Sequence, residues 1–157
     1  MGIDNDFDMA YLKSQIGAGQ KLNDIKNIFI SVRDEDKEEI SNIAKLLSKN
    51  GFNIFSTRGT NEFLSQRGIK SKLVNKVAEG SPHVVEYIKE NKLDLVINTT
   101  EDKQAIKDSF AIRRNSVDLS VPYYTNLRAA KILTKSLIFY KNQSISVKPI
   151  QNHHKLN

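Results

Sequence analysis

Cysteine and tryptophan are absent from this chain of 157 residues, and no run approaches the roughly 18 apolar residues that a membrane helix needs. Without cysteine, the chain can form neither disulfides nor thiolate metal sites. Its first ten residues, MGIDNDFDMA, lack the basic and apolar regions of a secretory signal. We therefore expect a cytoplasmic protein that has no membrane partner.

Aromatic residues are also sparse, at 8% of the chain, while the formal net charge is +6. A basic protein favours anionic partners, but the lysines and arginines are scattered and are not interleaved with the aromatics that stack nucleic-acid bases. We expect no nucleic-acid partner; a nucleic-acid binder stays open as an alternative that predicts steep salt dependence. His83, His153 and His154 have no supporting acid cluster, so we expect no metal site.

Short apolar segments alternate with amphipathic segments of helical length, which is typical of a parallel sheet covered by helices on both faces. The predicted fold class is therefore α/β, a Rossmann-like parallel sheet of about five strands. The predicted strands lie at 27–32, 52–55, within 71–77, at 93–100 and 119–124, with a last short one at 144–150. The predicted helices span 34–51, 60–68, 81–92, 101–118 and 126–142.

The first residues form a separate segment. Phe7, Ala10, Tyr11 and Ser14 recur at helical spacing over 4–16, with Asp4 or Asn5 able to cap the helix. The sequence GAGQKLND then breaks the pattern and predicts a flexible connection. We expect one domain from 24 to 150, a helical segment with its linker at 1–23, and a polar tail at 151–157.

Polar side chains cluster where the predicted strands end. Because the carboxyl ends of parallel strands meet at one edge of the sheet, and ligands bind there, these residues are expected to converge. Free N–H groups of the following helices favour anions, and Gly59 would let a ligand approach the backbone. The sequence predicts a phosphate cradle made of Ser31, Lys37, Thr57, Arg58, Thr60, Asn75, Lys76, Asn98, Thr99 and Thr100.

Five ordered blocks resemble a known family. They are FISVRDEDKEEISNIAKLLSKNGF, TRGT, LVNKVAEGSPHV, INTTEDKQAIKDSFAIRR and VPYYTNL. In order and spacing they resemble the C-terminal regulatory domain of the large subunit of carbamoyl phosphate synthetase, and 1–23 resembles the end of the preceding synthetic domain. The resemblance implies a methylglyoxal-synthase-like fold and allosteric control of an ATP-dependent, glutamine-hydrolysing ligase of arginine and pyrimidine biosynthesis.

The resemblance also implies ligands and partners. UMP or IMP would bind as effector through Ser31, Lys37, Thr57, Thr60, Lys76, Asn98, Thr99 and Thr100. Arg58 stands where the family often has histidine, so it would add a phosphate donor or face solvent. Tyr123 and Thr125 match part of an ornithine site that would be incomplete here. The partners implied are the catalytic domains and, through them, the glutaminase small subunit; no cofactor or catalytic residue is expected in this chain alone.

An enzyme with the same fold provides the rival interpretation. Methylglyoxal synthase, a lyase acting on dihydroxyacetone phosphate, needs a catalytic aspartate in a glycine-rich loop after the third strand. Here that loop reads NKVAEGSPH, with Glu79 as its one acid. The Lys-Thr-Leu-His-Pro motif of the IMP cyclohydrolase domain is absent as well. A cradle without a placed base can bind a phosphate but has little means of moving a proton.

Overall fold

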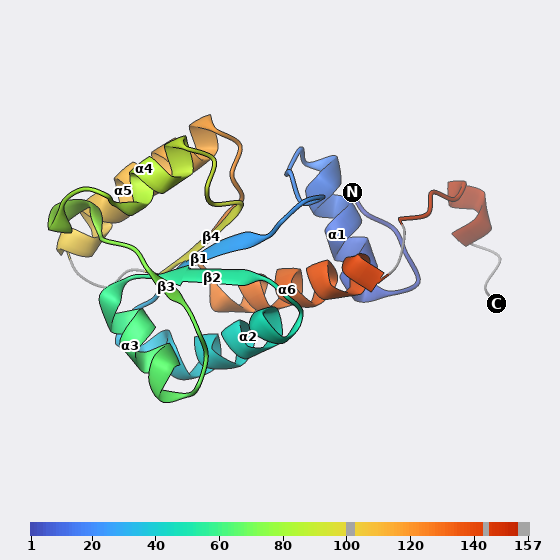
Figure 1. Ribbon diagram of the computed structural model, residues 1–157. Helices are drawn as coiled ribbons and strands as arrows, with labels where there is room; N and C mark the ends of the chain where they lie inside the picture. Colours follow the sequence, from blue (N-terminus) through green and yellow to red (C-terminus); the bar gives the residue numbers. More distant parts are fainter. Residues whose placement is uncertain (100–102, 143–144, 154–157) are drawn as a thin grey trace.

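The computed structural model describes residues 1–99, 103–142 and 145–153, and its centre is a parallel sheet of five strands (Figure 1). The strand order is β3-β2-β1-β4-β5, and every neighbouring pair is parallel. This confirms the predicted fold class. All carboxyl ends therefore lie at one edge of the sheet. The strands are β1 (Asn27–Ser31), β2 (Asn53–Ser56), β3 (Lys72–Leu73), β4 (Leu95–Asn98) and β5 (Tyr123–Tyr124).

The central strand β1 is buried on both faces, as parallel strands covered by helices must be. Ile28, Phe29 and Ile30 are each fully buried. Because successive side chains alternate in direction, Ile28 and Ile30 enter one hydrophobic layer and Phe29 enters the other. The run of β-branched and aromatic residues thus serves two cores at once.

The larger layer packs four helices against one side of the sheet. These are α1 (Phe7–Gly17), α2 (Lys37–Lys49, after a 3-10 turn at Asp34–Asp36), α3 (Arg58–Gln66) and α6 (Leu127–Asn142). In Figure 1, α2, α3 and α6 lie beneath the strands and α1 lies to their right. The predicted apolar faces of α2 and α6 are confirmed. All the residues predicted for these faces are buried, namely Ile40, Ile43, Ala44 and Leu47 on α2, and Leu127, Ala130, Leu133 and Leu137 on α6.

The smaller layer consists of α4 (Val84–Lys89) and α5 (Lys103–Asp118), which lie above the sheet in Figure 1. Phe29 meets Val84, Ile88 and Ile112 there in one apolar cluster. Among the helices of the described residues, none combines the length and the apolar character that a membrane crossing requires.

The N-terminal helix differs from the prediction in its cap and its face. Asp6 is the N-cap, and its carboxylate accepts from the N–H of Met9 at 3.0 Å. Met9 and Leu12 are buried in the larger layer, whereas Phe7 is 67% exposed. The connection that follows is anchored through buried Leu22. The helix therefore shares the core of the domain, and its origin in a preceding domain stays a prediction.

The helix start predicted at Ser81 and the last predicted strand differ from the structure. The helix expected from Ser81 begins at Val84, with His83 as N-cap, so Pro82 precedes the helix. The strand predicted within 71–77 is present as the short β3, Lys72–Leu73. Over 145–149 the chain forms no strand and continues into a 3-10 turn at Ile150–His153; residue 144 lies outside the described part. Val147 is 93% exposed, so this apolar residue has no layer to pack against.

Candidate functional site

Hydroxyl groups end the three central strands at the carboxyl edge. Ser31 ends β1, Thr57 follows β2 and Thr99 follows β4. The Oγ of Ser31 lies 3.1 Å from the Oγ1 of Thr57, and the N–H of Thr99 donates to the Ser31 carbonyl at 3.0 Å. Residues that are far apart in the sequence are thus brought within hydrogen-bond distance, as the prediction required.

The loop after β1 fixes two threonine hydroxyls in one orientation. The N–H of Val32 donates to Thr60 Oγ1 at 3.3 Å, and the N–H of Arg33 donates to Thr99 Oγ1 at 3.1 Å. A hydroxyl that accepts one such bond still has its own proton to donate. Thr60 and Thr99 therefore each keep an O–H, held by the loop after β1, that can be donated to a ligand.

Lys37, the first residue of α2, supplies the positive charge. Its side chain is 19% exposed, and its ammonium lies 5.8 Å from the centre of the Phe63 ring. A Cβ added at Gly59 would lie 3.7 Å from the Nζ of Lys37, so the glycine keeps the space beside the ammonium open. The Nζ also donates to Asp34 Oδ1 at 2.7 Å, and this bond lowers the pKa of the Asp34 carboxyl below its ordinary value.

The N-terminus of α3 contributes backbone donors to the same edge. Thr57 is its N-cap and is 4% exposed, but no side chain caps the first turn. The first N–H groups of a helix have no partner within the helix, and they attract anions. Arg58 begins the helix and is exposed, so its guanidinium is on the solvent side of this edge.

The remaining predicted cradle residues are less tightly placed. Asn98 is buried, and its amide nitrogen donates to Ser109 Oγ at 2.8 Å and Tyr123 OH at 2.9 Å, away from the threonine pair. Lys76 is exposed after β3, and Asn75 lies beside it, where its amide nitrogen donates to the carbonyl of Gly80. Thr100 lies outside the described residues. Ser31, Lys37, Thr57, Thr60 and Thr99 thus form the part that the structure brings together, which we call the rim.

Tyr123 lies on β5, where its hydroxyl accepts from Asn98, and Thr125 follows the strand. Both line a pocket of about 470 Å³ together with Arg113 and the buried Ser116. Thr125 also lines a more polar pocket of about 580 Å³ that contains Thr99. Their role in holding ornithine stays a prediction.

Two features of the site were missed by sequence reasoning. The ion pair of Asp34 with Lys37 could have been found, because charges three residues apart at a helix start are neighbours. The bonds from Asn98 to Ser109 and Tyr123 depend on how α5 and β5 pack against β4, and no local pattern in the sequence indicates them.

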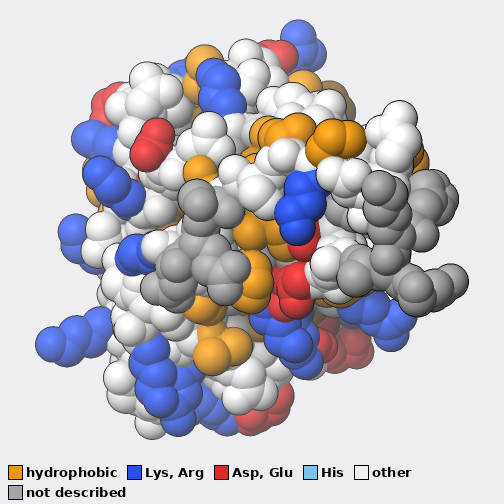
Figure 2. Space-filling view, turned by 90° about the vertical axis from the view of Figure 1, so that its right-hand side faces the viewer, with side chains coloured by type: hydrophobic (Ala, Val, Ile, Leu, Met, Phe, Trp, Pro, Cys, Tyr) orange, Lys and Arg blue, Asp and Glu red, His pale blue; other side chains and the backbone are white. Residues whose placement is uncertain are grey.

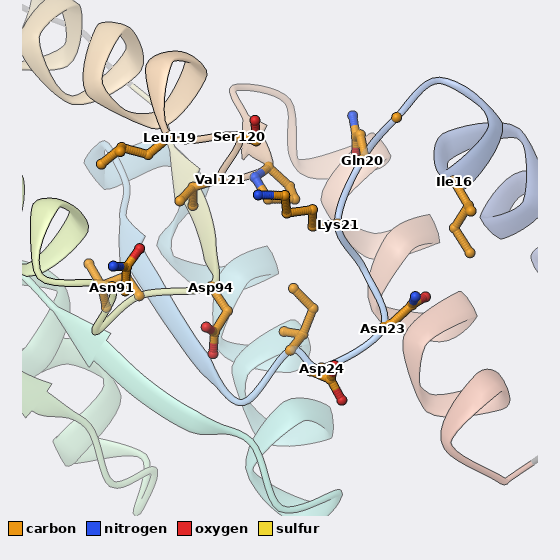
Figure 3. Close-up of a pocket in the computed structure, with 14 residues that line it drawn as sticks. Ile16, Gln20, Lys21, Asn23, Asp24, Asn91, Asp94, Leu119, Ser120 and Val121 are labelled. Carbon is orange, nitrogen blue, oxygen red and sulfur yellow. The ribbon is translucent and has the colours of Figure 1, made fainter.

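The amino edge of the sheet has a hollow of its own. Figure 2 faces this side, where apolar side chains gather between charges of both signs. A pocket of about 470 Å³ lies between the linker after α1 and the loops that precede β4 and β5 (Figure 3). Asp94, one of its acids, already accepts the N–H groups of Lys26 and Asn27 at 2.9 and 2.8 Å. No set of hydroxyl donors comparable to the rim lines this pocket.

The fold and the rim define a parallel α/β domain that has hydroxyl groups and a lysine ammonium at the carboxyl edge of its sheet. A family model for the MGS-like domain matches residues 39–125. The chain belongs to the MGS-like domain family.

Relatives of known name are similar over the whole chain. The carbamoyl phosphate synthase large chain of Myxococcus xanthus is 43% identical over all 157 residues, which make up 14% of that protein. The C-terminal section of the same enzyme's large chain from Methanopyrus kandleri is 43% identical over 99% of this chain and 29% of its own length. The chain therefore spans a small part of these relatives. The family resemblance that the sequence blocks indicated is confirmed.

A solved structure supports the fold independently. Methylglyoxal synthase from Elizabethkingia anophelis superimposes with a TM-score of 0.59, covering 85% of this chain and 92% of that one. At 16% sequence identity the likeness concerns the fold alone.

Proposed function

We propose that this chain is the allosteric regulatory domain of a carbamoyl phosphate synthase large chain and that it binds a nucleoside monophosphate at the rim. The observation that carries the proposal is that the loop after β1 bonds the hydroxyls of Thr60 and Thr99, while the Lys37 ammonium lies beside Gly59, the residue before Thr60. The names of the relatives support the assignment to that enzyme. The whole enzyme would act as an ATP-dependent, glutamine-hydrolysing ligase in the cytoplasm.

The chemistry of the rim suits a phosphate monoester. Such a group carries about 1.5 to 2 negative charges at pH 7 and accepts through three oxygens. The hydroxyls of Thr60 and Thr99, the N-terminal amides of α3 and the Lys37 ammonium offer donors of three different kinds. Asn98, Lys76, Arg58 and Thr100 complete the proposed effector site, with UMP or IMP as the ligand.

Effector binding would act on the catalytic domains by changing how this domain packs against them. Such coupling requires a different effector affinity in the two states of the enzyme and is typically worth about 1–3 kcal/mol. The glutaminase small subunit would sense the change through the catalytic domains. Tyr123 and Thr125 would contribute one side of an ornithine site.

A lyase activity is a weaker interpretation of the same fold. Glu79 is the acid in the loop after β3, but it is exposed and its carboxylate accepts the N–H of Lys76 at 2.8 Å. This bond ties the carboxylate to the turn of the loop. A general base needs to reach the proton that it removes, so Glu79 is poorly placed for that role.

Calorimetric titration with UMP and with IMP tests the proposal. We expect measurable binding of at least one nucleotide, and we expect Lys37→Met to weaken it about ten- to a hundredfold, because a charge-assisted bond to phosphate is lost. Lys45→Met removes the same charge from an exposed position of the same helix and should leave the affinity within about twofold. Absence of binding by both nucleotides, or equal losses in the two variants, would contradict the proposal.

A further inference from the structure

We propose that Asp34 is a built-in competitor of the effector phosphate, which holds the Lys37 ammonium when the site is empty and must be displaced when the phosphate binds. The inference rests on the proposed function of the rim and goes beyond it. The new element is the role of Asp34. This acidic residue would repel the phosphate and would thereby set the affinity of the site for the effector.

The two partners of this ion pair differ sharply in burial. The Lys37 side chain is 19% exposed, whereas that of Asp34 is 88% exposed. The Lys37 ammonium lies 5.8 Å from the centre of the Phe63 ring and beside Gly59, which gives it a defined place at the rim. Asp34 reaches this ammonium from solvent, with 2.7 Å between its Oδ1 and the Nζ. The carboxylate can therefore leave at small cost, while the ammonium stays.

The neighbouring acids do not share this position. Arg33 pairs with Asp36 at 2.8 Å and with Glu35 at 3.7 Å. The three acids of the turn before α2 therefore pair with two cations, Arg33 and Lys37. Among the described residues, only the pair with Asp34 involves a residue of the rim. Asp34 is thus the acid whose removal should change the rim directly.

A bound phosphate would compete with Asp34 for Lys37 and would also repel it. The dianion needs the Lys37 donor that Asp34 occupies, and its charge repels the carboxylate. An exposed carboxylate gains little from its ion pair, so a strong oxyanion displaces it, whereas an uncharged ligand does not. The exchange lowers the affinity for the effector and restricts tight binding to ligands that carry the full phosphate charge.

The test is calorimetric titration of UMP and of uridine into the wild-type chain, Asp34→Asn and Glu35→Gln. Asp34→Asn should lower the Kd of UMP about two- to tenfold, because competitor and repulsion are both removed. Glu35→Gln removes the same charge one residue away without touching Lys37 and should change the Kd by less than about twofold. Uridine, which lacks the phosphate, should gain nothing from either substitution.

A double-variant comparison separates a direct effect from a general change of charge. In a Lys37→Met background, Asp34→Asn should lose most of its effect, because coupled residues are not additive. Equal gains from Asp34→Asn and Glu35→Gln, or an undiminished gain in the Lys37→Met background, would overturn the role of Asp34 and leave the effector site intact. Failure of UMP and IMP to bind both the wild type and Asp34→Asn would overturn the effector site itself.

Discussion

The polar groups at the two edges of the sheet differ in how their hydrogen-bonding capacity is used. At the amino edge, the Asp94 carboxylate accepts two backbone N–H groups, and the Asn53 amide donates to Asn27 Oδ1 at 2.9 Å. These groups bond to one another and tie β1 to β4 and to β2. At the carboxyl edge, Thr60 and Thr99 each accept one backbone bond and keep a proton to donate.

The difference separates polar groups that hold the fold from polar groups that are available to a ligand. A buried or half-buried group whose bonds all lie within the chain contributes to stability, and its loss destabilises the protein. A hydroxyl oriented by one backbone bond costs little to hold and is ready to bind. Substitutions at the amino edge should therefore change unfolding, while substitutions at the carboxyl edge should change binding.

Asp94→Ala should have the largest effect on stability and none on binding. Two charge-assisted hydrogen bonds are lost, each typically worth about 1.5–3 kcal/mol, and water compensates in part at the exposed N–H of Lys26. We expect the free energy of unfolding to fall by about 2–4 kcal/mol in urea titrations followed by circular dichroism. Asp24→Ala, at an exposed acid of the same edge, should change it by less than about 0.5 kcal/mol. A changed Kd for UMP in a folded Asp94→Ala protein would break the comparison.

Thr99→Val should show the opposite behaviour at the carboxyl edge. The variant keeps the shape of the side chain but removes the donor proton, so the Kd of UMP should rise about ten- to fiftyfold, the cost of one bond to a charged acceptor. Its stability should fall by about 1 kcal/mol or less, because water can replace the acceptor for the N–H of Arg33, an exposed residue. Ser48→Ala, which removes an exposed hydroxyl of α2 that lies outside the rim, is the control and should change neither quantity. A loss of stability without a loss of affinity would make Thr99 a structural residue.

The part of the site that the sequence predicted well follows from topology. Once the strands are parallel, Ser31, Thr57 and Thr99 must end at the same edge, and no knowledge of packing is needed to place them together. The apolar faces of α2 and α6 were also readable, because their helical periodicity is regular over three or four turns. These features depend on the direction of the chain and on hydrophobic spacing, which local sequence determines.

The rest depended on contacts between distant segments. Asn98 is a polar residue at the end of β4, like its neighbour Thr99, yet its side chain bonds to Ser109 on α5 and to Tyr123 on β5. In α1, Phe7 fitted the helical spacing, but Met9 and Leu12 are the residues that meet α6. Short or weakly amphipathic elements take their orientation from their tertiary partners, so their faces were not readable from the sequence.

On β5, the adjacent residues Tyr123 and Tyr124 face opposite layers of the fold, and their hydroxyls show the same difference between the rim and the interior. Tyr123 bonds to Asn98 near the rim, whereas the hydroxyl of Tyr124 donates to Gln20 Oε1 at 3.0 Å and to Gln15 Oε1 at 3.3 Å. Tyr124 is buried, and this burial raises the pKa of its hydroxyl well above the ordinary value near 10. Its bonds lie within the chain, as at the amino edge, so it should affect stability alone.

Tyr124→Phe should therefore have the smallest effect at neutral pH and a distinctive one in alkali. Loss of its hydrogen bonds should lower the free energy of unfolding by about 1 kcal/mol at pH 7. Above the unfolded pKa near 10, the unfolded wild-type chain ionises this tyrosine while the folded chain keeps the proton, so wild-type stability falls by up to about 1.4 kcal/mol per pH unit from this group. The variant lacks that contribution, so the stability advantage of the wild type should decline from pH 10 onward and be lost by pH 11. A constant difference across this range, or a weakened Kd for UMP, would place Tyr124 among the groups that serve the rim.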